Sequence, residues 1–332
     1  MTYAFAQHES IGPAVKRIAR EQLDQTIEDI SSGDDERDER VHDARQRLKK
    51  LRGLLRLVRR EIGQSVFARE NACFRDAARE LAAAREAAAI IESFDGLLDR
   101  FELEVSREAF DDVRKLLVGS HRDVLSQALD PARLARVDQM LKLARERVPS
   151  WPIARNDFRA LAGGFRGTYR RGRRVLRAIS REPSVRLFHD FRRIAKYHLH
   201  HVRLLEGVWR SELKSRRKSL EELSDALGDL HDLDGLRRRL AEELSQGQQR
   251  SKVSSLLALV DRRIEELGLE ARSLGARIYA EKPEALTRRF RTYFEAWRFD
   301  AATAHERPLP RAPVPASTEL PGTRAGGRDS PN

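Results

Sequence analysis

The segment VHDARQRLKKLRGLLRLVRR, residues 41–60, places cationic side chains at steps of three and four along a pattern that predicts a helix. At this spacing the side chains lie on one helix face, roughly 5–6 Å apart. Guanidinium and ammonium groups so arranged can each bind phosphate oxygens. The chemistry that this row can perform is therefore the binding of a polyanion. Its members are His42, Arg45, Lys49, Arg52, Arg56 and Arg59.

An apolar row accompanies these cations along the same predicted helix. At about 100° per residue, the centres of the two rows lie about 110° apart, so they are not opposite each other. The cations therefore border the core face, where the lower effective dielectric constant strengthens contacts with an anion. The apolar row consists of Leu48, Leu51, Leu55, Val58 and Ile62.

A second segment repeats this layout. HDFRRIAKY at 189–197 resembles HDARQRLKK at 42–50, with His, Arg at +3 and Lys at +7 in both. Its apolar row is Phe188, Phe191, Ala195, Leu199 and Val202. Its cationic row is His189, Arg192, Lys196 and Arg203, with Arg193 and His200 as further candidates.

A weaker similarity follows each copy at nearly the same offset. ELAAAREAAAIIESF resembles LGDLHDLDGLRRRL, and Arg85 lies 43 residues after His42, as His231 lies 42 residues after His189. Two similarities at matching offsets predict two related helical units, each presenting a basic helix.

Positive charge is concentrated in three windows. Residues 42–60, 163–181 and 186–203 hold twenty Arg or Lys and two Asp, whereas the net charge of the whole chain is only +12. The rest of the chain is therefore mildly acidic, and this pattern is typical of a polyanion site. Aromatic residues, which nucleic-acid binders use to stack bases, are few near the windows: Tyr169, Tyr197 and Phe191.

The elements that must position these side chains are all helices. No segment alternates convincingly with period two, so we expect an all-α fold over residues 1–300. Six of the twelve prolines follow residue 300, which predicts a disordered tail at 301–332. The expected helices are 11–31, 37–62, 64–94, 97–118, 121–147, 155–180, 184–211, 214–245, 251–280 and 284–299.

The sequence also predicts the cellular location of the protein and whether it needs a metal or cofactor. No secretory signal or membrane-spanning run is expected, and the single cysteine is compatible with a reducing compartment, so we expect a cytoplasmic protein. His198 and His201 share a helix face, but no Cys lies nearby and the sequence identifies no Asp or Glu partner, so we expect neither a metal nor another cofactor.

The motifs resemble one known family. The H-x-x-R-x-x-x-K motif occurs twice, FRGTYRRGRRVL at 165–176 lies between the copies, and LGDLHDLDGLRRRL at 227–240 follows. Over about residues 8–299 this order resembles the CHAD family, the conserved histidine α-helical domain. The resemblance implies two four-helix bundles, about 8–147 and 155–299, related by a pseudo-twofold axis around a basic central groove or pore. It also implies binding of inorganic polyphosphate and association with bacterial polyphosphate granules.

The resemblance also implies the binding residues. They fall on His42, Arg45, Lys49, Lys50 and Arg52 in the first basic helix, on His189, Arg192 and Lys196 in the second, and on Tyr169, Arg170, Arg173 and Arg174 between them. The chain departs from the family pattern at two places. Arg85 precedes Glu86 rather than Asp, and Tyr197 and Leu199 stand where many members have Arg.

The function expected from these residues is non-catalytic binding of polyphosphate. The alternatives are an RNA- or DNA-binding protein and an enzyme acting on polyphosphate. Against an enzyme, no Walker A motif and no metal-binding carboxylate cluster occur in the basic windows. Arg217 and Arg238, which lie outside the windows, are expected to contribute little to binding.

Overall fold

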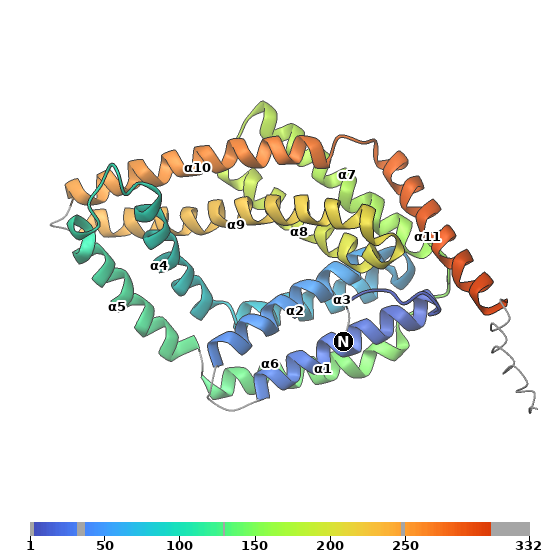
Figure 1. Ribbon diagram of the computed structural model, residues 1–332. Coiled ribbons are helices and arrows are strands. Elements are labelled where there is room, and N and C mark those ends of the chain that lie inside the picture. Colours follow the sequence, from blue (N-terminus) through green and yellow to red (C-terminus); the bar gives the residue numbers. More distant parts are fainter. Residues whose placement is uncertain (1–2, 32–36, 129, 247–249, 307–332) are drawn as a thin grey trace, which may run out of the picture.

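The computed structural model describes residues 3–31, 37–128, 130–246 and 250–306 (Figure 1). These residues form eleven α-helices and three short 3-10 turns, with no strand among them, so the all-α prediction is confirmed. The helices are α1 (Ile11–Ser31), α2 (Arg37–Leu57), α3 (Arg59–Glu80), α4 (Ala83–Arg100), α5 (Asp111–Ala128), α6 (Pro131–Arg147), α7 (Arg159–Arg181), α8 (Val185–Leu205), α9 (Arg210–Gln246), α10 (Arg250–Ile278) and α11 (Pro283–Glu306).

The helices pack in two groups that meet through α2 and α8. Helices α1, α2, α3 and α6 contact one another, and α7, α8, α9 and α10 form the other group. Helix α2 packs on both α8 and α7, which joins the groups. The pair α4–α5 extends away from the first group to reach α9, and α11 lies along α7 (Figure 1). A twofold relation between the groups stays a prediction.

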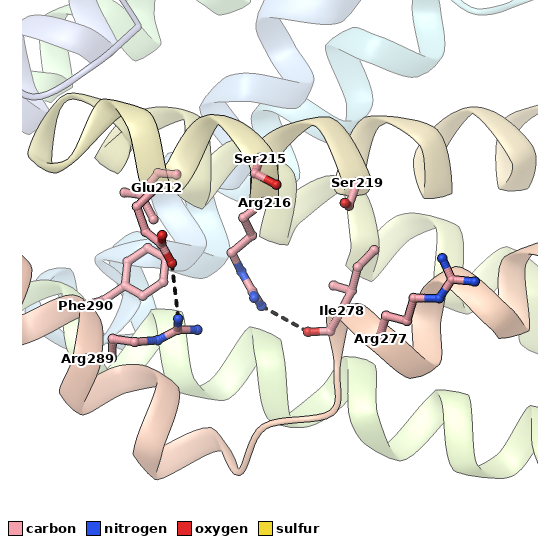
Figure 2. A pocket seen from close by; sticks show the side chains of 9 residues that line it. Glu212, Ser215, Arg216, Ser219, Arg277, Ile278, Arg289 and Phe290 are labelled. Carbon is pink, nitrogen blue, oxygen red and sulfur yellow. Dashed lines mark hydrogen bonds and ion pairs between the residues drawn. The ribbon is translucent and has the colours of Figure 1, made fainter.

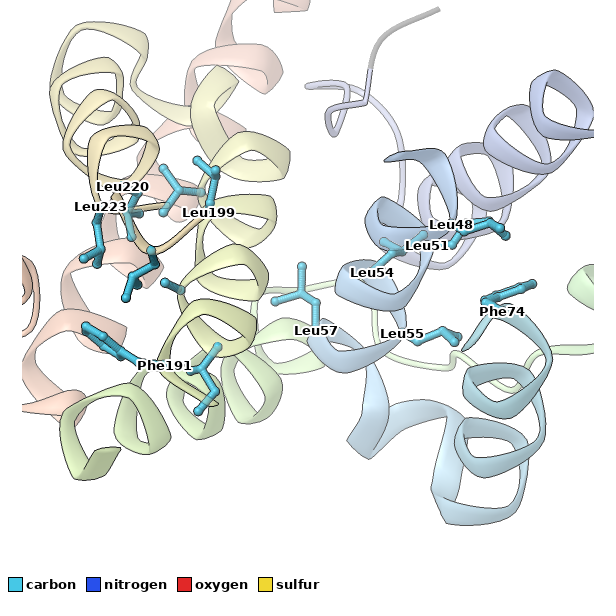
Figure 3. Packing of buried hydrophobic residues seen from close by; sticks show 14 of the residues in the cluster. Leu48, Leu51, Leu54, Leu55, Leu57, Phe74, Phe191, Leu199, Leu220 and Leu223 are labelled. Carbon is cyan, nitrogen blue, oxygen red and sulfur yellow. The ribbon is translucent and has the colours of Figure 1, made fainter. Parts of the chain in front are cut away.

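Both apolar rows expected from the sequence are buried. Figure 3 shows Leu48, Leu51, Leu54, Leu55 and Phe74 on one side of the contact, with Phe191, Leu199, Leu220 and Leu223 on the other and Leu57 between. Each fully buried leucine stabilises the fold by about 1.5–3 kcal/mol relative to an exposed one. Because Leu54 and Leu57 are buried as well, α2 has apolar contacts on two faces and exposes only a narrow strip.

The expected helices 37–62 and 64–94 are each interrupted by a break that the sequence did not predict. The expected helix 37–62 ends at Leu57, and α3 begins at Arg59. Within α3 the backbone is kinked at Gly63, whose φ of +77° favours glycine. The expected helix 64–94 is interrupted at Leu81 and Ala82, where α3 ends before α4.

Two further expected helices are also divided. The 97–118 helix is broken after Arg100, and a 3-10 turn at Glu108–Phe110 precedes α5. The 121–147 helix is divided between α5 and α6, because Asp130 caps α6 and Pro131 occupies its first turn. Helix α11 continues to Glu306, past the expected start of the tail at residue 301. The rest of that predicted tail, 307–332, lies outside the described residues.

Candidate anion-binding site

The two cationic rows meet around one cavity of about 740 Å³, here named the central cavity. Arg45 and Lys49 reach it from α2, and Arg192 and Lys196, at the matching positions of the second copy, reach it from α8. Helix α9 forms a further side. The charged and histidine side chains of its lining are His42, Arg45, Lys49, Arg192, Lys196, Asp225, Asp229, His231, Asp232, Arg238, Arg239 and Glu242.

A glycine lets the two basic helices approach so closely. A Cβ atom on Gly53 of α2 would lie 2.8 Å from the Cβ of His200 on α8, closer than real Cβ atoms lie. The Nε2–H of His201 donates to the carbonyl oxygen of Gly53 at 3.0 Å. Burial lowers the pKa of His201 to about 3, so this ring is neutral at physiological pH. These contacts fix the crossing that brings the rows together.

The cations in the central cavity repel one another. Burial, together with the charges of Lys196, Arg45 and Arg192, lowers the pKa of Lys49 to about 7. Burial and the charge of Arg192 lower the pKa of Lys196 to about 8. Both ammonium groups are therefore less stable in the folded protein than in water. A negatively charged ligand between the two ammonium groups would stabilise them and raise the pKa values of both lysines.

Helix α9 supplies carboxylates on the facing side of the cavity. The charges of Asp232 and Asp225 oppose the lowering of the pKa of Lys196, and Asp232 does the same for Lys49. Burial, and then the charge of Asp232, raises the pKa of Asp229. The carboxylates therefore compensate part of the positive charge in the central cavity.

The two repeated histidines have different surroundings. His42 lines the central cavity, where its Nε2 lies 3.2 Å from Nε2 of Gln46. His189 instead faces α9, with its Nε2 3.2 Å from Nδ1 of His231 and 3.5 Å from Oδ2 of Asp234. Burial lowers the pKa of His189 despite the opposing charge of Asp234. His189 thus connects α8 to α9, and only His42 of the pair faces the cavity.

Arg56 and Arg193, also expected in the rows, line a different cavity of about 600 Å³. We name it the arginine cavity, because its charged lining consists of Arg56, Arg59, Arg60, Arg171 and Arg193. Nearby Arg52 lies with its Nε 3.4 Å from Oδ1 of Asn71. The side chains of the two cationic rows therefore line two separate cavities and not one groove.

Several other candidates lie away from both cavities. Lys50 has its Nζ 5.8 Å from the ring centre of Tyr3, His200 is 5% exposed, and Arg203 is paired with Glu221 at 2.7 Å. Arg170 is paired with Glu284 at 2.6 Å, while Arg173 and Arg174 follow it along α7 outside both linings. Arg85 belongs to α4, but its side chain lies outside the described part of the structure.

Tyr169, another expected binding residue, is buried in the core and lines neither cavity. It is fully buried, and its hydroxyl donates to the carbonyl oxygens of Ile278 and Glu281 at 3.3 and 3.0 Å. Figure 2 shows Arg216 pointing at the same Ile278 carbonyl, which its Nη2 reaches at 3.1 Å. These donors satisfy carbonyls at the C-terminal end of α10. The small cavity beside them has a volume of about 240 Å³, and its Arg289 is paired with Glu281.

Sequence reasoning missed the cationic contribution of α9. Arg238 and Arg239 line the central cavity, although Arg238 was expected to contribute little to binding. The sequence contains a pattern that could have identified Arg238. It follows His231 by seven residues, which is two helical turns, so both side chains lie on the same face of the helix. Arg217, by contrast, is paired with Glu206 and Glu221 away from both cavities.

The described residues have neither a membrane-spanning helix nor a cluster of metal-ligating side chains. None of the described helices combines the length and the apolar character needed to cross a membrane. Among the same residues, no group of three or more His, Cys, Asp or Glu side chains is placed to hold a metal ion. His198, one of the pair considered for a metal, is buried with its Nε2 3.2 Å from Nη2 of Arg216.

Comparison with known proteins agrees with this architecture. Residues 17–241 match the CHAD domain family. The fold is similar to the crystal structure of the CHAD domain from the plant Ricinus communis, with 17% sequence identity and a TM-score of 0.55, over 82% of this chain and 93% of that chain. No curated protein matches the sequence. The matched segment contains both copies of the basic motif and most of α9. The protein belongs to the CHAD domain family.

Proposed function

We propose that the protein binds inorganic polyphosphate in the central cavity and catalyses no reaction on it. The observation that carries this proposal is the convergence of Arg45 and Lys49 with Arg192 and Lys196 around one cavity. Their mutual repulsion and burial lower the pKa values of both lysines. Phosphates placed among these groups would supply the opposing charge and form charge-assisted hydrogen bonds.

The lining favours polyphosphate over a nucleic acid. Polyphosphate carries charge along a flexible chain and has no bases to be recognised. Within the described residues, no Phe, Tyr or Trp lines the central cavity, and Tyr197 of the arginine cavity is 8% exposed beneath Arg56. Single-stranded nucleic-acid binders instead offer accessible aromatic faces on which bases stack. The surroundings therefore support recognition of phosphate groups alone.

The polar groups of the cavity favour binding over catalysis. A hydroxyl that attacks a phosphate is normally activated by a hydrogen-bonded general base. Ser224 is the hydroxyl-bearing residue of the central cavity lining, and it is 3% exposed. Among the described residues, its side chain donates no hydrogen bond to His231 or to a carboxylate. Ser224 is therefore not arranged as an activated nucleophile toward a bound phosphate.

Binding titrations test this proposal. Purified protein is titrated with long-chain polyphosphate at several salt concentrations, with RNA and single-stranded DNA as competitors at fixed salt. We expect log K for polyphosphate to fall linearly with log salt, and polyphosphate to displace both nucleic acids. Tighter binding of RNA or DNA would overturn the assignment of the ligand.

Charge reversal locates the binding site. Arg45→Glu with Lys49→Glu, and Arg192→Glu with Lys196→Glu, should each weaken polyphosphate binding by at least about tenfold, since several charge-assisted contacts are lost. The matched control is Lys115→Glu with Arg136→Glu, which changes the net charge equally at exposed positions of α5 and α6. Equal losses in the control would show that net charge governs binding. Circular dichroism checks that each variant stays helical.

Binding to polyphosphate granules is the cellular consequence that we propose. A granule presents many copies of the same ligand, so weak contacts of single chains add up. A fluorescent fusion of the whole chain should colocalise with granules, and the Arg45→Glu, Lys49→Glu variant should not. Colocalisation of that variant would contradict docking through the central cavity.

A further inference from the structure

A small cavity of about 240 Å³ lies between α9, the C-terminal end of α10 and the N-terminal part of α11, as Figure 2 shows. We name it the α9–α11 cavity. It shares no lining residue with the central cavity or with the arginine cavity, so it is separate from both. The polar side chains of its lining are Glu212, Ser215, Arg216, Ser219, Arg277 and Arg289.

Arg216 brings a positive charge to this cavity without a carboxylate partner among the described residues. Its Nη2 donates to the carbonyl oxygen of Ile278 at 3.1 Å and to Nε2 of His198 at 3.2 Å. Both acceptors are neutral, because burial holds the pKa of His198 well below its usual value. Burial lowers the pKa of Arg216 too, and the charge of Arg289 adds to this effect. An anion beside Arg216 would therefore stabilise its charged form.

Two buried arginine N–H groups of the cavity have no acceptor. The Nε–H of Arg216 donates to no described residue, and neither does the Nε–H of Arg289. Arg289 uses its other nitrogens, with Nη2 2.7 Å from Oε2 of Glu281 and Nη1 3.5 Å from Oε1 of Glu212. Buried donors without an acceptor are rare in native proteins and destabilise the fold. A ligand that accepts hydrogen bonds from a slightly rotated guanidinium would remove this cost.

Two serine hydroxyls add further donors from α9. Ser215 and Ser219 lie four residues apart, beside Arg216, so all three are on the side of the helix that lines the cavity. Neither hydroxyl forms a hydrogen bond with another described residue, so both can donate to a ligand. Arginines together with free hydroxyls suit an anion that carries several oxygen atoms.

The size of the cavity and one acidic residue narrow the choice of anion. The volume of about 240 Å³ is about a third of that of the central cavity, which suits one small ion and not a segment of a polymer. Glu212 lines the same cavity, and an ionised carboxylate can only accept hydrogen bonds. Orthophosphate retains at least one proton at neutral pH and can donate it to this carboxylate. Sulfate has no such proton and would be repelled.

We propose that the α9–α11 cavity binds one orthophosphate ion. Arg216, Arg289 and the hydroxyls of Ser215 and Ser219 donate to its oxygens, and Glu212 accepts a hydrogen bond from its protonated oxygen. The inference goes beyond the proposed function, because the ligand is a single small ion and the site lies apart from the central cavity.

Calorimetric titration with sodium phosphate and with sodium sulfate, at pH 7 and fixed ionic strength, tests the site. The unaltered protein is compared with Arg45→Glu, Lys49→Glu, in which the central cavity is impaired. Ser215→Ala with Ser219→Ala removes two donors from the α9–α11 cavity without touching the apolar core. The matched control is Ser251→Ala with Ser255→Ala, which removes two hydroxyls at the same spacing from the surface of α10. Circular dichroism checks the fold of every variant.

We expect orthophosphate to bind the unaltered protein and the central-cavity variant equally well. The Ser215→Ala, Ser219→Ala variant should lose at least about tenfold in affinity, since two hydrogen bonds to an anion disappear, and the control should lose none. Equal affinities of this variant and its control would overturn the site. Loss of orthophosphate binding in the central-cavity variant would also overturn it, because the ion would then bind in the central cavity.

The comparison with sulfate tests the role of Glu212. We expect the unaltered protein to prefer orthophosphate to sulfate by at least about tenfold. Glu212→Gln should reduce this preference by increasing the affinity for sulfate, because the side chain then no longer repels an unprotonated ion. Glu222→Gln, an exposed change on α9 outside the cavity, is the control and should leave the preference unchanged. Equal affinity of the unaltered protein for the two ions would overturn the assignment of orthophosphate.

Discussion

The guanidinium of Arg56 lies 3.8 Å from the centre of the Tyr197 ring, across the contact between α2 and α8. The family resemblance implied an arginine at the position of Tyr197, and the tyrosine found there has a structural consequence. An arginine at this position would add a sixth cation beside Arg56, Arg171 and Arg193. The aromatic face instead stabilises the cation that is already present.

A double-mutant cycle should detect this contact. Arg56→Gln, Tyr197→Leu and the double variant are expected to show a coupling of about 1–2 kcal/mol in the free energy of unfolding, the range of a largely desolvated cation–π pair. Urea denaturation measures it. Arg56→Gln combined with Tyr293→Leu serves as the control, because Tyr293 packs against Trp209 instead. Additive effects in the Tyr197 cycle would mean that the contact contributes nothing to stability.

Polyphosphate binding should take up protons near pH 8. In the unliganded protein the pKa values of Lys49 and Lys196 are lowered to about 7 and 8, so both lysines are partly neutral at this pH. Bound phosphates favour the ammonium forms and raise both pKa values. Affinity should therefore decrease as the pH rises above 7. Calorimetry in buffers of different ionisation enthalpy measures the proton number, and Lys49→Gln should reduce it while Lys115→Gln should not.

The crossing of the basic helices depends on Gly53. An alanine there would place its Cβ 2.8 Å from the Cβ of His200, so α2 and α8 must separate. We expect Gly53→Ala to lower the free energy of unfolding by about 1–3 kcal/mol, a cost typical of overpacking. Gly96→Ala is the matched control in α4, where a Cβ meets nothing within 4 Å. Since Gly disfavours helix interiors, that control should be neutral or stabilise by about 0.5–1 kcal/mol.

The elements with strong periodicity were predictable, and their ends were less so. Helix α1 matches its expected range, because apolar residues recur regularly up to SSGDD. The break at Leu81 occurs within an alanine-rich run that favours helix throughout, so tertiary packing decided it. The start of α6 was different. Asp130 followed by Pro131 is a recognisable N-cap signal, and it was overlooked.

For the site, local patterns identified the rows but not which cavity each side chain enters. Spacing placed Lys49 and Arg56 on one face of α2, yet they line separate cavities, and the close contact of Gly53 with His200 lies between them along α2. Spacing placed Arg59 in the cationic row but did not predict that Arg59 and Arg60 line a cavity. They line a cavity only because Gly163 and Gly164 bring α7 against them. Such close approaches depend on contacts between residues far apart in the chain, which periodicity does not encode.

The carboxylates of α9 should restrain the affinity of the central cavity. Asp232 lines it and raises the pKa values of Lys49 and Lys196 against the effect of burial. A phosphate chain in the same cavity is repelled by this carboxylate. At pH 6, where both lysines are protonated, Asp232→Asn should therefore increase polyphosphate affinity several-fold.

Asp232→Asn should increase polyphosphate affinity less at alkaline pH than at pH 6. Without Asp232 the pKa values of both lysines fall further, so at pH 8.5 each carries less positive charge and the gain in affinity shrinks. Titrations at the two pH values measure both effects. Glu146→Gln, an exposed change on α6 that also removes one negative charge, is the control. A gain from Asp232→Asn that equals the control or does not vary with pH would show that this carboxylate does not act on the bound phosphates.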